Sequence, residues 1–588
     1  RNGQSWNGMC AECHSTNLEK NLDPDTGTYA TTWSEIDVSC EACHGPGSRH
    51  VAWAQADNED TQSVDNFGLE VVSSGLDNRR YVEMCAACHA RRSEIGNYEH
   101  GQADLLEHFV PALLGEGLYH ADGQILDEVF VWGSFVQSKM YRNGVSCGDC
   151  HDPHSLLLLR EGNALCTHCH EPETYDTSSH HFHQPLVLGE PSDGALCVKC
   201  HMPEQAYMVI DYRADHSLRM PRPDLSASLG VPNSCSQSGC HDDEALDWVV
   251  DAYTRWFGEA DMPHYGSVLA AARAGDAGAR DGLIALADDP LAATIVRATA
   301  LRALAAYPPE RSMPVIQRAL ADEEPLLRHT AAEALVTDGS EMSARLLAPL
   351  LFDPVRAVRM RAASQLAGIP REYLTGEQSA ALDRELKAYV TAMRSMLDFA
   401  SSGLNLGNLY DMQGDPESAE HYYRKAIEVD DLFFPAKMNL AVLLSRNGRD
   451  SEAESLLREV LAGYPEQHDA AYSLALVLVA SGRYEEALTY LDRAANGLPG
   501  RSRIHYNRGL LLAQMGRDED AEEALLDALR LEPESVDYLY ALTDFYARRD
   551  RLEEALELAR RMIEAHPGNR IGDALRDAIQ ERIRSQDN

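Results

Sequence analysis

The sequence predicts a mainly α-helical chain with two dissimilar halves, a cysteine-rich half of short helices and loops followed by an α-solenoid. Three observations support this prediction. All 14 cysteines lie between Cys10 and Cys240. Beyond residue 245, alanine, leucine, arginine and glutamate recur at helical spacing and cysteine is absent. Two sequence repeats of different period then extend to residue 568.

The cysteines form six Cys-x-x-Cys-His motifs and one stretched copy with a longer spacer between its cysteines. Two thiols on one turn can each bond to a haem vinyl group, and the histidine that follows binds the iron as its proximal ligand. We therefore expect seven covalently attached haems of type c. The predicted ligands are Cys10/Cys13/His14, Cys40/Cys43/His44, Cys85/Cys88/His89, Cys147/Cys150/His151, Cys166/Cys169/His170, Cys197/Cys200/His201 and the stretched copy Cys235/Cys240/His241.

Zinc sites and disulfides are the competing interpretations of these cysteines. Zinc chemistry does not require a histidine directly after every second cysteine. A Cys-x-x-Cys loop is a redox couple rather than a structural crosslink, which disfavours seven disulfides. The stretched motif is the least certain of the seven as a haem site, but its cysteines have no other evident partners.

Seven haems leave little room for a core of side chains in so short a segment. We therefore predict that residues 1–245 form a multihaem cytochrome c domain whose apolar interior is supplied by the porphyrins. Loss of haem is then expected to unfold this domain.

A repeat marked by arginine follows. Arg297, Arg328 and Arg359 recur at equal spacing, each on an alanine-rich helix that follows a proline-containing loop. The pattern resembles HEAT repeats, which predicts helical pairs over residues 246–370 and a connecting helix over 371–399.

The second repeat has a slightly longer period, and its marker residues recur more regularly. A glycine that ends the first helix, a small residue that permits close helix crossing and a closing proline return in register. These features predict five tetratricopeptide repeats over residues 400–568, and a capping helix and tail over 569–588. Such solenoids either bind a partner or act as rigid spacers, and we expect partner docking. The glycines are Gly414, Gly448, Gly482 and Gly516, and Asp550 takes this position in the last copy.

The sixth ligands of the irons decide between an electron carrier and a catalyst. Ten further histidines lie between His50 and His216, so every iron can be bis-histidine and closed to substrate. His154 lies just beyond a proximal ligand, after a proline, where it can bind a neighbouring haem. His50 follows a turn-rich segment that can place a ligand in the same way. The others are the cluster His180, His181 and His183, then His120 and His216, and three histidines assigned to the surface, His100, His108 and His168.

The net charge of −41 argues against nucleic acid or an anionic membrane as a partner, because either would repel the chain. No apolar run is long enough to span a bilayer. Attachment of haem c takes place outside the cytoplasm, so we predict a periplasmic or extracellular, secreted protein. The chain opens at Arg1, and we expect it to be a processed or partial polypeptide.

Several segments carry a family resemblance. The first half resembles multihaem cytochromes of the nitrite reductase, hydroxylamine oxidoreductase and tetrahaem donor group, and more closely the secreted multihaem cytochromes with C-terminal tetratricopeptide repeats. This resemblance implies distal roles for His50, His120, His154, His216 and the cluster from His180 to His183. It also implies a further N-terminal segment with one more haem motif. The segments that carry it are 6–18, 37–48, 118–124, 148–154, 200–203 and 215–224.

We therefore expect an exported electron carrier whose bis-histidine haems form a conduction path and whose repeats dock redox partners or sister subunits. A homo-oligomer or a conductive filament is the expected assembly. The alternative is a multihaem oxidoreductase that acts on a small nitrogen or sulfur compound at one open iron. In that case His241 holds the open haem, and Arg213, Arg219 or Arg222 holds an anion. The same arginines can instead pair with haem propionates, which we favour.

Overall fold

The computed structural model describes residues 5–56, 64–72, 75–96, 105–187, 189–207, 210–237, 239–260, 262–335 and 337–586. The chain forms two compact units. Unit 1 comprises residues 1–274 and 278–402, and unit 2 comprises 275–277 and 403–588. Helices dominate both units, which confirms the predicted fold class. Among the described helices, none combines the length and apolarity needed to cross a membrane.

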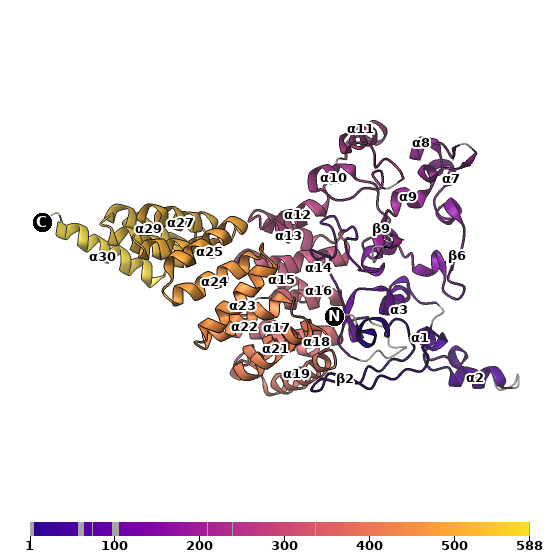
Figure 1. Cartoon of the computed structure of the whole chain (residues 1–588), viewed down its shortest axis with the longest axis horizontal. Coiled ribbons are helices and arrows are strands. Elements are labelled where there is room, and N and C mark those ends of the chain that lie inside the picture. Colours follow the sequence, from indigo (N-terminus) through magenta and orange to yellow (C-terminus); the bar gives the residue numbers. More distant parts are fainter. Residues whose placement is uncertain are drawn as a thin grey trace. The chain divides into compact units, whose positions relative to one another are not determined.

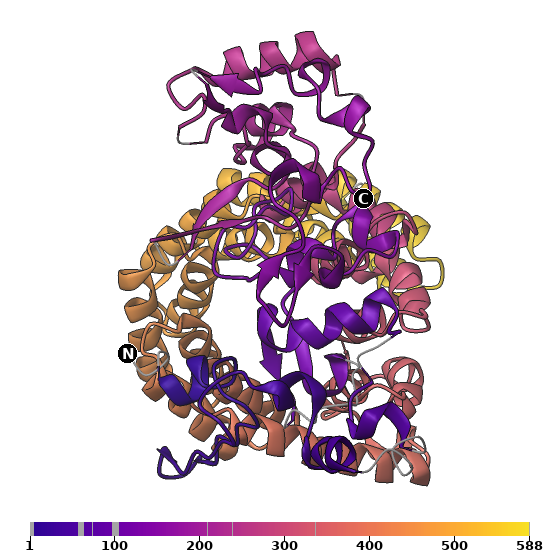
Figure 2. The same ribbon diagram turned by 90° about the vertical axis from the view of Figure 1, so that its right-hand side faces the viewer.

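The cysteine-rich part of unit 1 consists mostly of helices shorter than three turns, joined by loops. In both views its earliest helices lie at one end and its latest at the other (Figures 1 and 2). This part is therefore elongated along the vertical direction of both pictures. Its α-helices are α1 (Cys40–His44), α2 (Ser48–Gln55), α3 (Asn78–His89), α4 (Leu105–His108), α5 (Trp132–Phe135), α6 (Lys139–Arg142), α7 (Pro172–Tyr175), α8 (Ser178–His181), α9 (Cys197–His201) and α10 (Pro223–Leu229).

Small antiparallel hairpins connect these helices. Each pairs two strands that are adjacent in the sequence, and none extends into a larger sheet within the described residues. Strands this short leave no alternating pattern in the sequence, and they were not predicted. The pairs are β1 (Leu22–Asp23) with β2 (Thr28–Tyr29), β3 (Arg92–Glu94) with β4 (Phe109–Pro111), β5 (His151–Asp152) with β6 (Leu157–Leu158), β7 (Leu186–Val187) with β8 (Glu190–Pro191), and β9 (Glu204–Tyr207) with β10 (Asp211–Ala214).

The cysteine-rich part also has a small core of side chains around Phe109, Leu114 and Tyr119, each at most 1% exposed. The core joins the helical repeats of the same unit, because the Leu114 amide donates to Thr299 Oγ1 over 3.1 Å. The first half therefore does not depend on prosthetic groups alone for its apolar interior.

The repeat marked by arginine forms the helical remainder of unit 1. Its periodic arginines reach into the following repeat: Arg297 pairs with Asp322 over 3.0 Å and Arg328 with Asp353 over 2.7 Å. These ion pairs explain why the arginine recurs. The helices are α11 (Leu246–Phe257), α12 (Tyr265–Arg273), α13 (Ala279–Asp288), α14 (Thr294–Ala303), α15 (Pro309–Ala319), α16 (Pro325–Ala334), α17 (Glu341–Leu347), α18 (Arg356–Gln365) and α19 (Gly376–Ser395).

Unit 2 is a solenoid whose helices follow one another in a curved array (Figure 2, orange to yellow). The periodic glycines have positive φ, +74° at Gly414 and +74° at Gly482, as expected for residues that end helices in the left-handed conformation. Asp550 adopts the same conformation, with φ +63°. The helices are α20 (Ala400–Met412), α21 (Pro416–Val429), α22 (Phe434–Arg446), α23 (Asp450–Gly463), α24 (His468–Ala480), α25 (Tyr484–Gly497), α26 (Ser502–Gln514), α27 (Asp518–Leu531), α28 (Val536–Arg548), α29 (Leu552–Ala565) and α30 (Arg570–Gln586).

Candidate metal centres

The second, third and sixth motifs lie on helical turns, in α1, at the end of α3 and in α9. In the first and fifth motifs the histidine amide closes the turn on the carbonyl of the first cysteine, from His14 to Cys10 and from His170 to Cys166, both over 3.0 Å. The stretched motif closes in the same way, because the His241 amide donates to the Cys235 carbonyl over 3.0 Å. Gly239, in its longer spacer, has φ +83°.

Cysteines of different motifs contact one another in pairs. All 14 thiols are free. A contact with Cys147 raises the pKa of Cys85, and a contact with Cys197 raises the pKa of Cys166. The Cys13 sulfur lies 3.8 Å from the Cys88 carbonyl oxygen, and contact with Cys88 lowers the pKa of Cys13.

Weaker interactions link the remaining neighbours. Burial first, and the nearby Cys169 among lesser causes, raises the pKa of Cys150. Burial and then Cys235 raise the pKa of Cys200 to about 11. Six of the seven motifs thus form one row, here called the file of motifs, in which each motif is next to the one named after it. Their order along this row is first, third, fourth, fifth, sixth and seventh. Cys43 of the second motif lies near Cys85, at the side of this file.

Four of the predicted proximal histidines face a predicted distal histidine. Two imidazoles that bind one metal ion through nitrogens at about 2.0 Å have ring centroids about 6 Å apart. The observed separations match this requirement, and the residues therefore fit a bis-histidine haem at four motifs. The pairs are His44 with His154 at 6.2 Å, His151 with His216 at 6.3 Å, His201 with His180 at 6.3 Å, and His241 with His183 at 5.9 Å.

Hydrogen bonds to the backbone orient several of these rings. The Nδ1 atom of His201 bonds to the Arg219 carbonyl over 2.8 Å, and that of His216 bonds to the Ala214 carbonyl over 2.9 Å. The Nδ1 atom of His50 bonds to the Phe67 carbonyl over 2.8 Å. An Nδ1 atom that donates to a carbonyl leaves Nε2 as the metal-binding nitrogen, which is the usual arrangement around metal-bound histidine.

The other predicted ligands are not brought together in the same way. Within the described residues, His14, His89 and His170 have no histidine ring as a partner. Of the unpaired distal candidates, His120 has a buried Nε2 atom without a hydrogen bond, a state that a metal ion would satisfy.

The remaining distal candidates have other surroundings. The ring of His50 stacks on that of Trp53 with centroids 5.3 Å apart, and the ring centroids of His181 and His183 are 6.5 Å apart. Of the histidines assigned to the surface, His168 is exposed, whereas His108 is buried with 7% exposure, contrary to that assignment. His100 lies outside the described residues.

A cavity of about 210 Å³ adjoins His89. Phe130, Val131, Ala206 and Arg213 are among the residues that line it, and His89 is the only histidine on its wall among the described residues. Burial, and then the charge of Arg213, lower the pKa of His89 and favour the neutral imidazole that binds metals.

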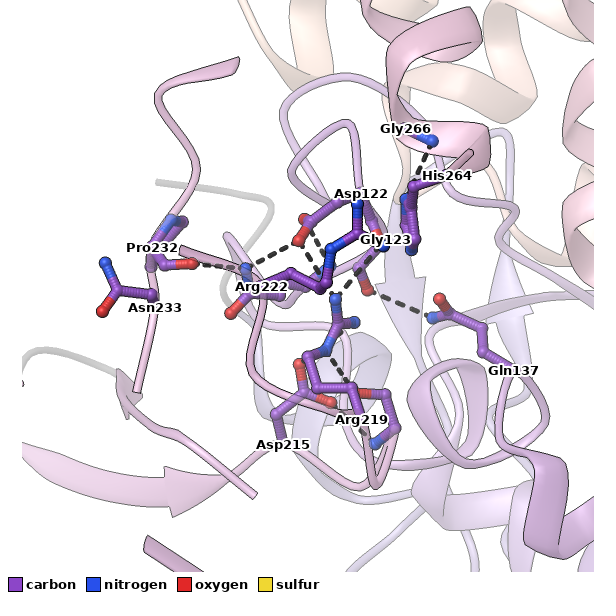
Figure 3. Close-up of polar contacts among 12 residues, drawn as sticks. Asp122, Gly123, Gln137, Asp215, Arg219, Arg222, Pro232, Asn233, His264 and Gly266 are labelled. Carbon is purple, nitrogen blue, oxygen red and sulfur yellow. Dashed lines mark hydrogen bonds and ion pairs between the residues drawn. The ribbon is translucent and has the colours of Figure 1, made fainter. Parts of the chain in front are cut away.

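A buried polar network that was not predicted from the sequence lies beside the sixth motif (Figure 3). Asp122 and Asp215 are each 2% exposed, and both face Arg219. The hydroxyl group of Tyr265 donates to the Asp122 carbonyl over 2.7 Å, and burial raises the pKa of Tyr265. Asp122 lies in one of the segments that carry the family resemblance, and Asp215 and Arg219 lie in another. Their charges alone resemble those of surface residues in an acidic chain, so the sequence offers little to distinguish them.

Comparisons with known proteins identify the repeats and part of the motif set. Residues 280–367 match a model of HEAT repeats, and residues 404–431, 446–503 and 506–570 match models of the tetratricopeptide repeat. Residues 139–174 match a model of the doubled CXXCH motif, which supports binding of haem c. No curated protein matches the chain.

Several solved structures of tetratricopeptide repeat proteins are similar to part of the chain. MamA from Desulfovibrio magneticus RS-1 is 24% identical over 29% of this chain and 96% of its own, with a TM-score of 0.27. YrrB, described as having an unusual peptide-binding site, is 24% identical over 32% of this chain and 96% of its own, with a TM-score of 0.28. The pilF protein of Pseudomonas aeruginosa is 24% identical over 32% of this chain and 86% of its own, with a TM-score of 0.29. Together with the family models, the structure shows HEAT and tetratricopeptide repeats joined in one chain to a doubled motif for haem c.

Proposed function

We propose that this chain is an exported multihaem c-type cytochrome that transfers electrons along seven haems, with helical repeats that dock redox partners or sister subunits. The observation that carries the proposal is the set of four histidine pairs at the separation that one iron requires. Bound haem supplies an iron that changes its oxidation state without releasing a ligand. The chain's own residues anchor the porphyrins through thioethers and close both faces of the metal.

The file of motifs supports a continuous path. The third motif, for example, contacts the first through Cys88 and Cys13, and the fourth through Cys85 and Cys147. The first and seventh motifs are the two ends of this file, and electrons enter at one end and leave at the other. The second motif joins at the side, and its proximal His44 pairs with His154 beyond the fourth motif.

The haem count tests the proposal directly. The intact mass of the purified exported protein is expected to exceed the polypeptide mass by seven haems, and iron analysis is expected to give seven atoms per chain. A colourless protein, or zinc in place of iron, would refute the proposal.

The helical repeats are the proposed docking region. The family models assign residues 280–367 and most of 404–570 to repeat classes that bind other proteins. Docking of sister subunits through these repeats, with terminal haems close to one another, would extend the path into a filament. Sedimentation and electron microscopy of the purified holoprotein test this part of the proposal, and a monomer at all concentrations would exclude the filament.

A second candidate function is oxidoreduction of a small nitrogen or sulfur compound at one open iron. The cavity beside His89 favours this motif for that role, because among the described residues no other histidine lines it. Arg213 on its wall brings a positive charge, but it pairs with Asp211 over 2.9 Å, and Asp127 and Glu128 also line the wall. The His241 site is less suited to that role, because His183 faces it. Electron paramagnetic resonance separates the candidates. Low-spin ferric signals alone support the electron carrier, whereas a high-spin signal that changes on addition of nitrite or sulfite supports the enzyme.

A further inference from the structure

A buried cluster of three charged side chains lies between two of the predicted iron ligands. Nη1 of Arg219 donates to Asp122 Oδ2 over 3.1 Å and to the Asp122 carbonyl over 3.2 Å. Its Nη2 atom lies 3.9 Å from Asp215 Oδ2. The side chains of Asp122 and Asp215 are 3% exposed and that of Arg219 is 17% exposed, so water screens these charges only weakly.

The cluster holds the turn that carries His216. Asp215 Oδ1 accepts from the Ser217 amide over 2.8 Å, and Asp215 Oδ2 accepts from the Ile125 amide over 3.3 Å. Nε of Arg219 donates to Ser217 Oγ over 2.8 Å. The residues on both sides of His216 are therefore fixed, and its ring faces His151 with centroids 6.3 Å apart.

The same arginine holds the ring of His201 through its backbone. The Arg219 carbonyl accepts from His201 Nδ1 over 2.8 Å, and the Arg219 amide donates to the His201 carbonyl over 3.1 Å. His201 is the proximal ligand of the sixth motif, whereas His216 faces the proximal ligand of the fourth. Arg219 thus contacts His201, a ligand of one predicted metal site, and the residues next to His216, a ligand of another.

Further hydrogen bonds make the cluster rigid. Gln124 Nε2 bonds to Asp122 Oδ2 over 2.8 Å and to the Pro232 carbonyl over 2.7 Å (Figure 3). The residue before Gln124 must be glycine for two reasons. The φ angle of Gly123 is +84°, and a Cβ added there would lie 2.2 Å from the Tyr265 hydroxyl oxygen. Arg219 is therefore held at a defined position.

We propose that the Asp122–Arg219–Asp215 cluster positions the axial imidazoles of two haems, His216 at the fourth motif and His201 at the sixth, with Arg219 as the shared positioning residue. The inference rests on the proposed function, since it requires haem at both motifs. Because the guanidinium already contacts Asp122, Asp215 and Ser217, Arg219 serves the neighbouring ligands rather than a haem propionate or a substrate anion. The orientation of an axial imidazole and its hydrogen bond set the ligand field and potential of the iron.

The test compares two arginines of the same segment in the full-length holoprotein. Arg219→Gln removes the charge that holds both aspartates. Arg222→Gln is the matched control, because Arg222 contacts Asp224 over 2.7 Å and the Met262 carbonyl over 3.2 Å, and neither residue belongs to the cluster. With seven haems retained by intact mass, Arg219→Gln is expected to change the low-spin g-values and the midpoint potential of the fourth-motif haem by releasing the turn that carries His216. The same change is expected at the sixth-motif haem, because the backbone of residue 219, which contacts His201, is no longer held in place by the aspartates. Arg222→Gln is expected to leave all signals unchanged.

Unchanged g-values and potentials in Arg219→Gln would overturn the positioning role. If that variant does not accumulate, Ser217→Ala removes a single contact of the cluster and is read in the same way. The haem count of the unmodified protein separates failure of the proposed function from failure of the positioning role. Absence of haem there refutes the proposed function, whereas seven haems with an unchanged signature in the variants refute only the positioning role.

Discussion

The imidazole rings of His44 and His154 face each other with centroids 6.2 Å apart and planes inclined by only 4°. His44 ends α1 in the second motif, and His154 lies just beyond the fourth. Burial, and then the neighbouring His154, lower the pKa of His44, which favours the neutral imidazole that binds metal ions.

Replacing the distal member of this pair is expected to open one iron. In His154→Ala, the haem of the second motif loses its sixth ligand, so one low-spin signal gives way to a high-spin signal in electron paramagnetic resonance. His168→Ala is the control, because His168 is exposed and has no proposed role. An unchanged spectrum in His154→Ala would show that His154 is not a ligand.

The stretched motif is expected to carry a haem like the others. The His241 amide donates to the carbonyl of the first cysteine, Cys235, as the histidine amide does in the first and fifth motifs. Cys235→Ala combined with Cys240→Ala is expected to lower the intact mass by one haem beyond the change in side chains. If the mass falls only by the difference between two cysteine and two alanine side chains, the stretched copy holds no haem.

The left-handed glycines of the solenoid are expected to resist substitution. At Gly482 an added Cβ meets no atom within 4 Å, but φ is +74°. Gly482→Ala should therefore lower the free energy of unfolding by about 1–2 kcal/mol through backbone strain alone. Thermal or chemical unfolding followed by circular dichroism measures this loss. Gly463→Ala is the matched control, since Gly463 is equally open and has no positive φ, and it is expected to cause no loss.

A buried histidine in the HEAT-like region predicts sensitivity to acid. Burial first, and then Arg361, lower the pKa of His329 from 6.5 to about 4. Between these values the unfolded chain binds a proton that the folded chain does not, so the stability present above pH 6.5 is lost as the pH falls towards 4.

Denaturation with urea at several pH values measures this effect. His329→Leu is expected to reduce the dependence of the unfolding free energy on pH by up to about 1.4 kcal/mol per pH unit in this range. Identical dependence in the variant and the unmodified chain would contradict the prediction.

The repeats were predictable from the sequence because their packing is local. Helices that contact their neighbours in the chain leave periodic small residues and glycines, as at Gly414 and Gly448, and the periodic arginines reflect ion pairs to the next repeat. The cysteine motifs were readable for the same reason, since two thiols and one imidazole share a turn.

Pairings across the chain were not predictable. His44 meets His154 and His241 meets His183 through the path of the whole cysteine-rich segment, which no spacing encodes. The Asp122–Arg219–Asp215 cluster was also missed, because an aspartate gives no sign of burial in a chain with a net charge of −41. The strands escaped prediction because each is too short to show periodicity.

The packing of the cysteine-rich segment on the HEAT-like helices has a consequence for protein engineering. The Leu114 amide and Thr299, and the Asp122 carbonyl and Tyr265, are hydrogen-bonded across the composition change near residue 245. A shortened chain that stops at that change would uncover Leu114 and Tyr119 and expose them to water. Unit 1 extends to residue 402 and contains both partners of each of these contacts, so a fragment that retains the HEAT-like helices keeps them.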